Sequence, residues 1–251
     1  MAAALFGKIR DPNIRCLLPH FDLFIDQEAA LEWDLDEDVL LHNREVVSFT
    51  SYFGRSDVFG DSTDLMKANY FLLRNFLLAH PEISRHNKAY ERETPLKAAN
   101  LYWARKHGFT IPRTTVGVCL EGFEVSNAVV KPLTGGHYVV EGVRARYPAI
   151  IQQKVRGSNR RLFLVGDQHF GFEIASDALD YRTDPSVKIK ICPFPEDVVR
   201  SALGYSRYLG LTFAALDFID NVFLEINTMP MFSAFDLLTD GQLSKAVRDS
   251  L

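Results

Sequence analysis

Two carboxylates and an amide gather near the end of the chain, in two runs that alternate like β-strands. Asp217 lies inside the apolar run LTFAALDFI, and Glu225 and Asn227 flank Ile226 in NVFLEIN. If a tight turn joins these runs, alternation puts Glu225 and Asn227 on one face, where Asp217 can join them. Such oxygens suit Mg²⁺, and two buried acids would be costly without a cation. A hairpin with one solvated face is the alternative.

Basic residues upstream could bind phosphate. Lys131 leaves the apolar run NAVVKPL shortly before Gly135 and Gly136, which can present an ammonium and backbone N–H groups to phosphate. The segment lacks GxxxxGK[ST], so it is not a P-loop, and a strand-edge lysine before an ordinary turn is the alternative. Arg161 and Arg182 offer forked donors for phosphate or carboxylate, with surface salt bridges as their alternative.

Composition excludes several classes of protein. Of 251 residues, 47% are hydrophobic and 24% charged, which is close to a globular average. No apolar run approaches the roughly 18 residues of a membrane span, and the apolar start is too short for a secretory signal. We therefore expect a cytoplasmic protein that does not contact the membrane. The cysteines Cys16, Cys119 and Cys192 lie too far apart for a disulfide framework or a zinc site.

The net charge of −4 is unevenly distributed. Residues 1–64 hold 5 Lys and Arg against 13 Asp and Glu, many of them in 28–38, and the remainder of the chain carries +4. Because no long basic run exists, we expect no nucleic-acid binding. A small polyanion such as a nucleoside triphosphate could still bind the mildly basic part. The acids could equally serve only to solvate the first domain.

The order of the predicted elements indicates a mixed α+β fold. The runs IRCLLPHFDLFI and EVVSFTSYF are β-rich, and 64–80 reads as a helix ended by Pro81. A second helix lies between Thr94 and Gly108, and antiparallel strands follow. A helix over 195–209, the closing hairpin and a short helix near Asp236 complete the chain. The expected buried stripe of the first helix is Leu65, Ala68, Leu72, Phe76 and Leu77.

From about Asn87 onward, the sequence resembles the ATP-grasp ligases, closest to ribosomal-protein glutamate ligases and microviridin-type (graspetide) peptide ligases. The resemblance rests on short motifs in a shared order and spacing. They are Lys97 ahead of GFTIPRT, Lys131 in VVKPL, IIQQKV, NRRLFLVGD, Asp180-Tyr181-Arg182, and Asp217, Glu225 and Asn227. Gln153 stands where the adenine hinge usually has an acid, and Asn159 replaces a usual Asp. The segment TMPMFSAFD differs from the endings of both groups, so the substrate stays open.

The resemblance implies an ATP-grasp fold of two α+β lobes with nucleotide between them. This domain would span 86–251, with a small lobe at about 112–152 and a large lobe at about 153–251. A shortened α/β domain over 1–85 would precede it. ATP and Mg²⁺ are the implied cofactors.

The implied activity is an ATP-dependent carboxylate–amine ligase that forms an amide through an acylphosphate on a peptide or small-molecule substrate. An ester or lactone would result if a hydroxyl attacked, and a non-catalytic ATP-binding regulatory module is a further alternative. The implied roles are phosphate binding by Lys97 and Lys131, loop closure at Gly135 and Gly136, adenine binding at Gln153, Lys154 and Val155, acylphosphate binding by Arg161, substrate orientation by Arg182, and magnesium binding by Asp217, Glu225 and Asn227.

Residues 1–85 also predict a homodimer, because a domain this small buries a low fraction of its surface. The acidic stretch 28–38 would rim the acceptor site or favour a basic substrate. The alternative is that the aromatic residues of this segment fill its own core. These residues are Phe21, Phe24, Trp33, Tyr52, Phe53, Tyr70 and Phe71.

Overall fold

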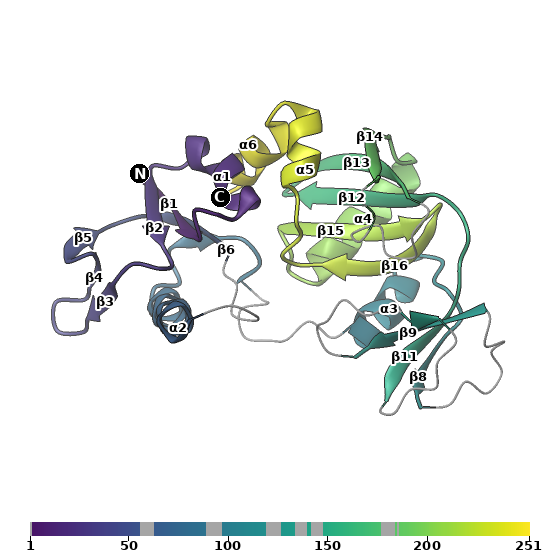
Figure 1. Cartoon of the computed structure of the whole chain (residues 1–251), viewed down its shortest axis with the longest axis horizontal. Coiled ribbons are helices and arrows are strands. Elements are labelled where there is room, and N and C mark those ends of the chain that lie inside the picture. Colours follow the sequence, from purple (N-terminus) through teal and green to yellow (C-terminus); the bar gives the residue numbers. More distant parts are fainter. Residues whose placement is uncertain are drawn as a thin grey trace. The chain divides into compact units, whose positions relative to one another are not determined.

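The computed structural model describes residues 2–55, 63–88, 97–118, 127–133, 140–141, 148–176, 184 and 186–251 (Figure 1). The chain divides into two compact units. The first contains 1–91 together with 231–251, and the second contains 92–230. The sequence predicted that the second domain would continue to residue 251. The structure instead packs the last segment with the first unit.

A parallel four-stranded sheet forms the centre of the first unit. Its order is β2 (Leu23–Asp26), β1 (Ala3–Gly7), β6 (Ser51–Arg55) and β7 (Ser84–Arg85). Strand β1 is buried throughout, as expected for a parallel strand covered on both faces. The first half of the predicted β-rich run is instead helix α1 (Pro12–Leu17), because Asp11 caps the Asn13 N–H and Pro12 fits the first turn.

Helix α2 (Asp64–Ala79) was predicted in the right place, and Phe76 and Leu77 are buried as predicted, but its first half buries other residues than expected. Leu65 and Ala68 are exposed, whereas Met66, Asn69 and Leu73 are buried. The cause is polar. The Asn69 amide donates to the carbonyls of Gln27 and Ala29 at 2.9 and 2.7 Å, and the Gln27 amide donates to the Met66 carbonyl. These buried hydrogen bonds set the rotation of the helix.

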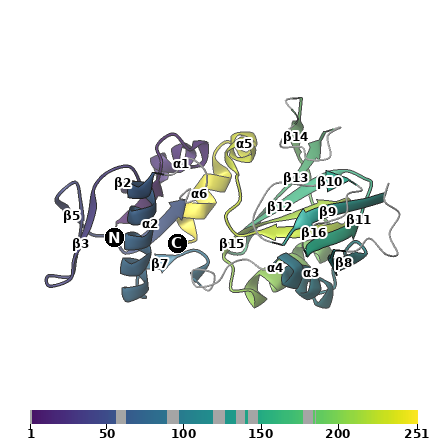
Figure 2. The same ribbon diagram turned by 60° about the horizontal axis from the view of Figure 1, so that its bottom comes forward.

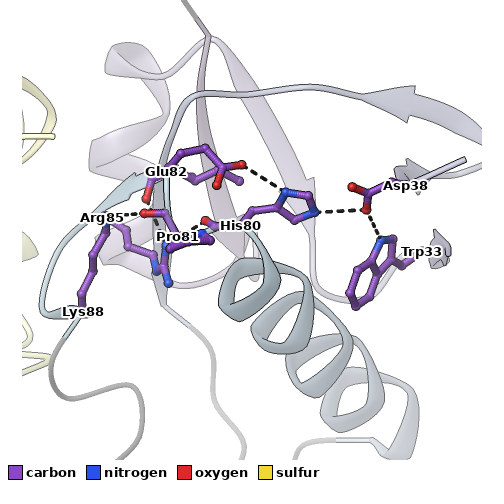
Figure 3. A network of polar contacts seen from close by, with 8 residues as sticks. Trp33, Asp38, His80, Pro81, Glu82, Arg85 and Lys88 are labelled. Carbon is purple, nitrogen blue, oxygen red and sulfur yellow. Dashed lines mark hydrogen bonds and ion pairs between the residues drawn. The ribbon is translucent and has the colours of Figure 1, made fainter.

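An antiparallel meander beside α2 carries part of the acidic stretch. Its strands are β3 (Leu31–Asp34), β4 (Val39–His42) and β5 (Glu45–Val47). Asp38 accepts a hydrogen bond from the Trp33 indole at 3.1 Å and lies 3.2 Å from Nε2 of His80 (Figure 3). Nδ1 of His80 lies 3.1 Å from Glu82, whose pKa is lowered by its own backbone N–H and by His80. This network joins the meander to the end of α2.

Most aromatic residues of the predicted dimer surface pack inside their own unit. Phe53 is buried, and the Trp33 ring meets Phe76 edge-on at 5.5 Å. Phe71 is the exception, at 52% exposure. The homodimer stays a prediction. The half-buried residues of the set are Phe21, Phe24, Trp33, Tyr52 and Tyr70.

The C-terminal segment is tied to the first unit by buried hydrogen bonds. The Asn13 side-chain oxygen accepts from the N–H groups of Phe232 and Ser233 at 2.7 and 2.9 Å. Within the C-terminal segment itself, the Asp236 carboxylate accepts from the Ser244 N–H. Burial, reinforced by the Asp236 charge, raises the pKa of the Cys16 thiol to about 12. The helices here are α5 (Ser233–Asp236) and α6 (Gln242–Asp249), so the predicted C-terminal helix is interrupted.

The described residues of the second unit form two antiparallel sheets and two longer helices. The smaller sheet has the order β10 (Val140–Glu141), β9 (Ala128–Pro132), β11 (Ala149–Gln153) and β8 (Thr114–Gly117). The larger sheet has the order β14 (Lys188–Ile191), β13 (Gln168–Ala175), β12 (Asn159–Val165), β15 (Phe213–Ile219) and β16 (Val222–Asn227). The predicted α+β fold class is confirmed. No helix in the described ranges is long and apolar enough to cross a membrane.

Helices α3 (Lys97–Lys106) and α4 (Glu196–Tyr208) lie along one face of the larger sheet (Figure 2). Phe109, just after α3, stacks on Phe223 of β16 with ring centroids 5.3 Å apart. The buried Tyr205 hydroxyl of α4 donates to the Asn100 carbonyl of α3. The opposite face of the sheet also carries buried apolar residues, Phe163, Phe172 and Phe213, and beside them a small group of polar side chains.

Replacing Asn13 by alanine should destabilise the first unit by about 3 kcal/mol, because two buried N–H groups would lose their acceptor. Urea unfolding followed by circular dichroism measures this change. Asn75→Ala, on the exposed face of α2, is the control and should cost less than about 0.5 kcal/mol. Equal losses in the two variants would contradict the role of Asn13 as an anchor.

Acid should weaken the same unit through His86. Burial lowers the pKa of this histidine, although its hydrogen bond to the Val247 carbonyl opposes the shift. The unfolded chain therefore binds more protons below the ordinary histidine pKa of about 6.5, so the free energy of unfolding falls as the pH drops through that value. Urea unfolding from pH 8 to pH 5.5 should show a smaller fall in His86→Gln. An identical pH dependence in both proteins would refute this assignment.

Candidate nucleotide and metal site

Three charged side chains stand side by side across the larger sheet. The register pairs Arg161 of β12 with Asp217 of β15, and Asp217 with Glu225 of β16. Asn227 is opposite Ala215, which places it diagonally next to Asp217. Strands β12, β15 and β16 are neighbours in Figure 1. The structure thus brings together four of the predicted site residues.

A β-bulge in β16 is what aligns them. Beyond the turn, Phe218 pairs with Phe223, but Asp217 pairs with Glu225, so Leu224 is the extra residue. Uninterrupted pairing from the turn would have set Asp217 opposite Leu224 and turned Glu225 to the other face. The meeting predicted from alternation and a tight turn therefore depends on this bulge, which has no local signal in the sequence.

Arg161 holds Asp217 through a two-pronged ion pair. Its Nε and Nη2 atoms donate to Oδ1 and Oδ2 of Asp217 at 2.6 and 2.8 Å. Arg161 is 5% exposed, and the Asp217 side chain is 14% exposed. Sequence reasoning treated Arg161 as a phosphate ligand and missed this pairing, which only the strand register reveals.

The adjacent Arg160 serves a different purpose. It points to the other face of β12, where its Nη2 donates to the Pro193 carbonyl at 2.6 Å and its guanidinium lies 4.0 Å from the centre of the Phe194 ring. The pair of arginines in the sequence is therefore split between the two faces of the sheet. Only Arg161 shares a face with the acids.

The oxygen donors of this cluster fit a magnesium ion. Asp217, Glu225 and Asn227 converge closely enough that the Asn227 amide donates to Oδ2 of Asp217 at 3.0 Å and lies 3.5 Å from Oε1 of Glu225. Two carboxylates and one amide give the few hard oxygens that Mg²⁺ takes from a protein. Within the described residues, no group of three or more His, Cys, Asp or Glu side chains could hold a metal. The amide is needed to complete the set.

The predicted phosphate and adenine residues lie on other elements of this unit. Lys131, half-buried on β9, is opposite Ile150 of β11, and the half-buried Lys97 begins α3. At the end of β11, the Gln153 N–H donates to the Arg113 carbonyl at 2.9 Å, and the N–H of the next residue, Lys154, donates to the Asn127 carbonyl at 2.8 Å. Val155 follows and is half-buried. The remaining predicted positions, Gly135, Gly136 and Arg182, fall outside the described residues.

Gln152 precedes Gln153 on β11 and has a structural role, a difference between the two glutamines that the sequence analysis did not draw. It is 1% exposed, and its amide donates to the Thr114 hydroxyl at 3.1 Å. It therefore fixes β11 to β8, whereas Gln153 is exposed. Strand alternation distinguishes the two, because neighbouring side chains point to opposite faces.

A pair of hydrogen bonds, called the latch below, joins Ser158 to Asp220. Ser158 lies in the segment between β11 and β12, and Asp220 lies in the turn between β15 and β16. Asp220 accepts from the Ser158 N–H at 2.9 Å through its carboxylate, and its own N–H donates to the Ser158 carbonyl at 2.8 Å. Gly157 comes so close that a Cβ there would stand 2.2 Å from the Asp220 carboxylate. The latch fixes the turn that precedes Glu225 and Asn227.

No protein-family model matches the sequence, and no curated protein matches it. Solved structures do match. The ATP-grasp ligase PsnB complexed with minimal precursor gives a TM-score of 0.79 at 16% identity, over 99% of this chain and 97% of that one. Macrocyclase MdnC from Microcystis aeruginosa MRC, bound with precursor peptide MdnA, gives 0.75 at 17% identity, with 99% and 98% covered.

A third solved structure agrees. The Chryseobacterium gregarium RiPP-associated ATP-grasp ligase, in complex with ADP and a leader and core peptide, gives a TM-score of 0.74 at 20% identity, covering 99% of this chain and 96% of that one. At these low sequence identities, the structural likeness shows a shared fold and no more. The chain has the ATP-grasp fold, and the predicted resemblance to peptide-modifying ATP-grasp ligases is confirmed at that level.

Substituting Gly157 by alanine should cost the second unit about 2 kcal/mol, because φ is +150° there and the new Cβ would collide with Asp220. Gly117→Ala is the control, since a Cβ at Gly117 meets nothing within 4 Å. Denaturant unfolding compares the two variants. A Gly157→Ala variant as stable as Gly117→Ala would show that the latch contributes nothing.

Proposed function

We propose that this chain is an ATP-dependent carboxylate–amine ligase that forms an amide bond on a peptide substrate. The observation that carries the proposal is the single polar row of Arg161, Asp217 and Glu225, with Asn227 beside it, in an ATP-grasp fold. The similar PsnB has been solved with minimal precursor, Mg and ADP, and with precursor peptide PsnA2 and AMPPNP. These complexes support ATP, Mg²⁺ and a peptide as the reactants here.

The acidic cluster would hold Mg²⁺ with the nucleotide phosphates. Asp217, Glu225 and Asn227 would supply the protein oxygens, and the bound ion would neutralise phosphate charge. Lys97 and Lys131 would bind the phosphates. The adenine would lie against 153–155, whose backbone is held by hydrogen bonds to Arg113 and Asn127.

The reaction would proceed in two balanced steps. A substrate carboxylate oxygen attacks the γ-phosphorus, and ADP leaves. The amine then attacks the acylphosphate carbonyl and loses a proton, and inorganic phosphate leaves. No protein nucleophile is needed, so the chain would act by positioning and charge neutralisation. Arg161 would meet the acylphosphate oxygens and Arg182 the substrate carboxylate. A hydroxyl in place of the amine would give an ester by the same route.

The test of this function uses purified chain, Mg-ATP and a peptide encoded beside its gene. One ADP should form for each bond, and the peptide should lose one water in mass spectrometry for each internal link. Resistance of the product to mild base distinguishes an amide from an ester. ATP binding without ADP release, with every peptide supplied, would favour the non-catalytic regulatory module instead. A ligase that consumes ATP also agrees with the expected cytoplasmic location.

Glu225→Ala and Asn227→Ala should each lower turnover by about a hundredfold or more, because the ion that neutralises phosphate would lose a ligand. Both should fold normally, and Glu225→Ala should be no less stable than the parent without metal, since it relieves repulsion with Asp217. Glu173→Ala is the matched control: this acid of β13 pairs with Lys190. Unchanged turnover in either site variant would remove the magnesium assignment.

A further inference from the structure

We propose that the outward face of helix α2 is the contact surface of a homodimer, in which α2 of one copy packs antiparallel against α2 of a second copy. The apolar residues of this face, called the outer stripe below, recur at helical spacing and are Leu65, Ala68, Phe71 and Leu72. Leu65 is 49% exposed and Phe71 is 52% exposed, Ala68 is exposed, and Leu72 is half-buried. The stripe lies in the segment 1–85, for which the sequence predicts a homodimer, and it takes no part in the proposed ligase chemistry.

Buried hydrogen bonds hold the outer stripe away from the core of its own unit. The Asn69 amide donates to the carbonyls of Gln27 and Ala29 at 2.9 and 2.7 Å, and the Gln27 amide donates to the Met66 carbonyl at 3.2 Å. Turning α2 to bury the stripe would break these bonds and leave buried polar groups without their partners, which is costly. The helix therefore keeps a second apolar face at the surface, and contact with another protein would remove that face from water.

The order of residues along the outer stripe fits an antiparallel copy of itself. Ala68 has the smallest side chain of the stripe, so two helices that cross with Ala68 on a twofold axis can approach closely. Each residue then lies level with the residue equally far beyond position 68 in the second copy. Leu65 comes level with Phe71 of the second copy and is next to its Leu72, so apolar side chains meet on both sides of the axis.

The charges beside the outer stripe favour the antiparallel direction and a second copy as the occupant. Asp64 begins α2 with a fully exposed side chain, and the half-buried Arg74 lies towards the other end. In the antiparallel pair, Arg74 of the second copy is about 3 Å along the helix axis from the level of Asp64, and this pairing occurs twice. Lys67, which lies 3.8 Å from Asp64 in its own helix, flanks the pair. Parallel helices would instead set like charges against each other.

A contact between two helices of about four turns is small, so we expect a reversible dimer with a Kd of about 10 µM. Sedimentation velocity from about 1 to about 200 µM measures this constant. Phe71→Asp should raise the Kd at least about tenfold, because it buries a charge in the apolar contact. Val46→Asp adds the same charge at an exposed position of β5 and should change the Kd by less than about threefold. A monomeric parent over this range, or equal losses in the two variants, would overturn the proposal.

Cysteine cross-linking tests the position of the axis and the direction of the helices. Ala68→Cys should form a disulfide with its own copy, since the two Cα atoms would lie within about 6 Å. Asn75→Cys is the matched control, because it is exposed on the same helix but would be about 21 Å from its copy. The parent, with three native cysteines, gives the background. Cross-linking of Asn75→Cys as fast as that of Ala68→Cys would contradict the antiparallel pair.

Exchanging the charges tests the pairing of Asp64 with Arg74. Asp64→Arg and Arg74→Asp should each associate more weakly than the parent, because each puts like charges at both pairings. An equimolar mixture should associate at least as tightly as the parent, since both pairings then join opposite charges. The parent net charge of −4 becomes −4 + 2 = −2 in the first variant and −4 − 2 = −6 in the second, so attraction between whole chains cannot explain this result. A mixture that stays monomeric would overturn the proposal.

Discussion

The register of three antiparallel strands, interrupted by one bulge, is the constraint on which the site depends. Because Leu224 is an extra residue, Glu225 returns to the face that carries Arg161 and Asp217. The apolar residues on the other face still meet α3 and α4. A single inserted residue thus keeps one face of the sheet packed against the helices and brings the charged side chains together on the other.

The polar face is held in place by its own ion pair. A buried pair contributes little net stability, but losing one partner leaves an uncompensated charge. Arg161 and Asp217 therefore maintain each other in a sheet that is otherwise apolar around them, with Phe163 and Phe172 as neighbours.

Local patterns predicted much of the fold but not its non-local features. Alternation located β11–β13, β15 and β16, and helical spacing located α2 and α4. The rotation of α2 depended on Asn69 reaching the carbonyls near Gln27, and the return of the C-terminus depended on Asn13. The bulge and the Arg161–Asp217 pair required the strand register. Apart from the bulge, these features are contacts between residues distant in sequence, so periodicity carries no trace of them.

The most direct test of the account is a crystal structure grown with Mn²⁺ and AMP-PNP, read by anomalous scattering. The account predicts a manganese peak coordinated by Asp217, Glu225 and Asn227, next to the phosphates, with adenine against 153–155. Nucleotide bound elsewhere in the second unit, or manganese held by other residues, would contradict it.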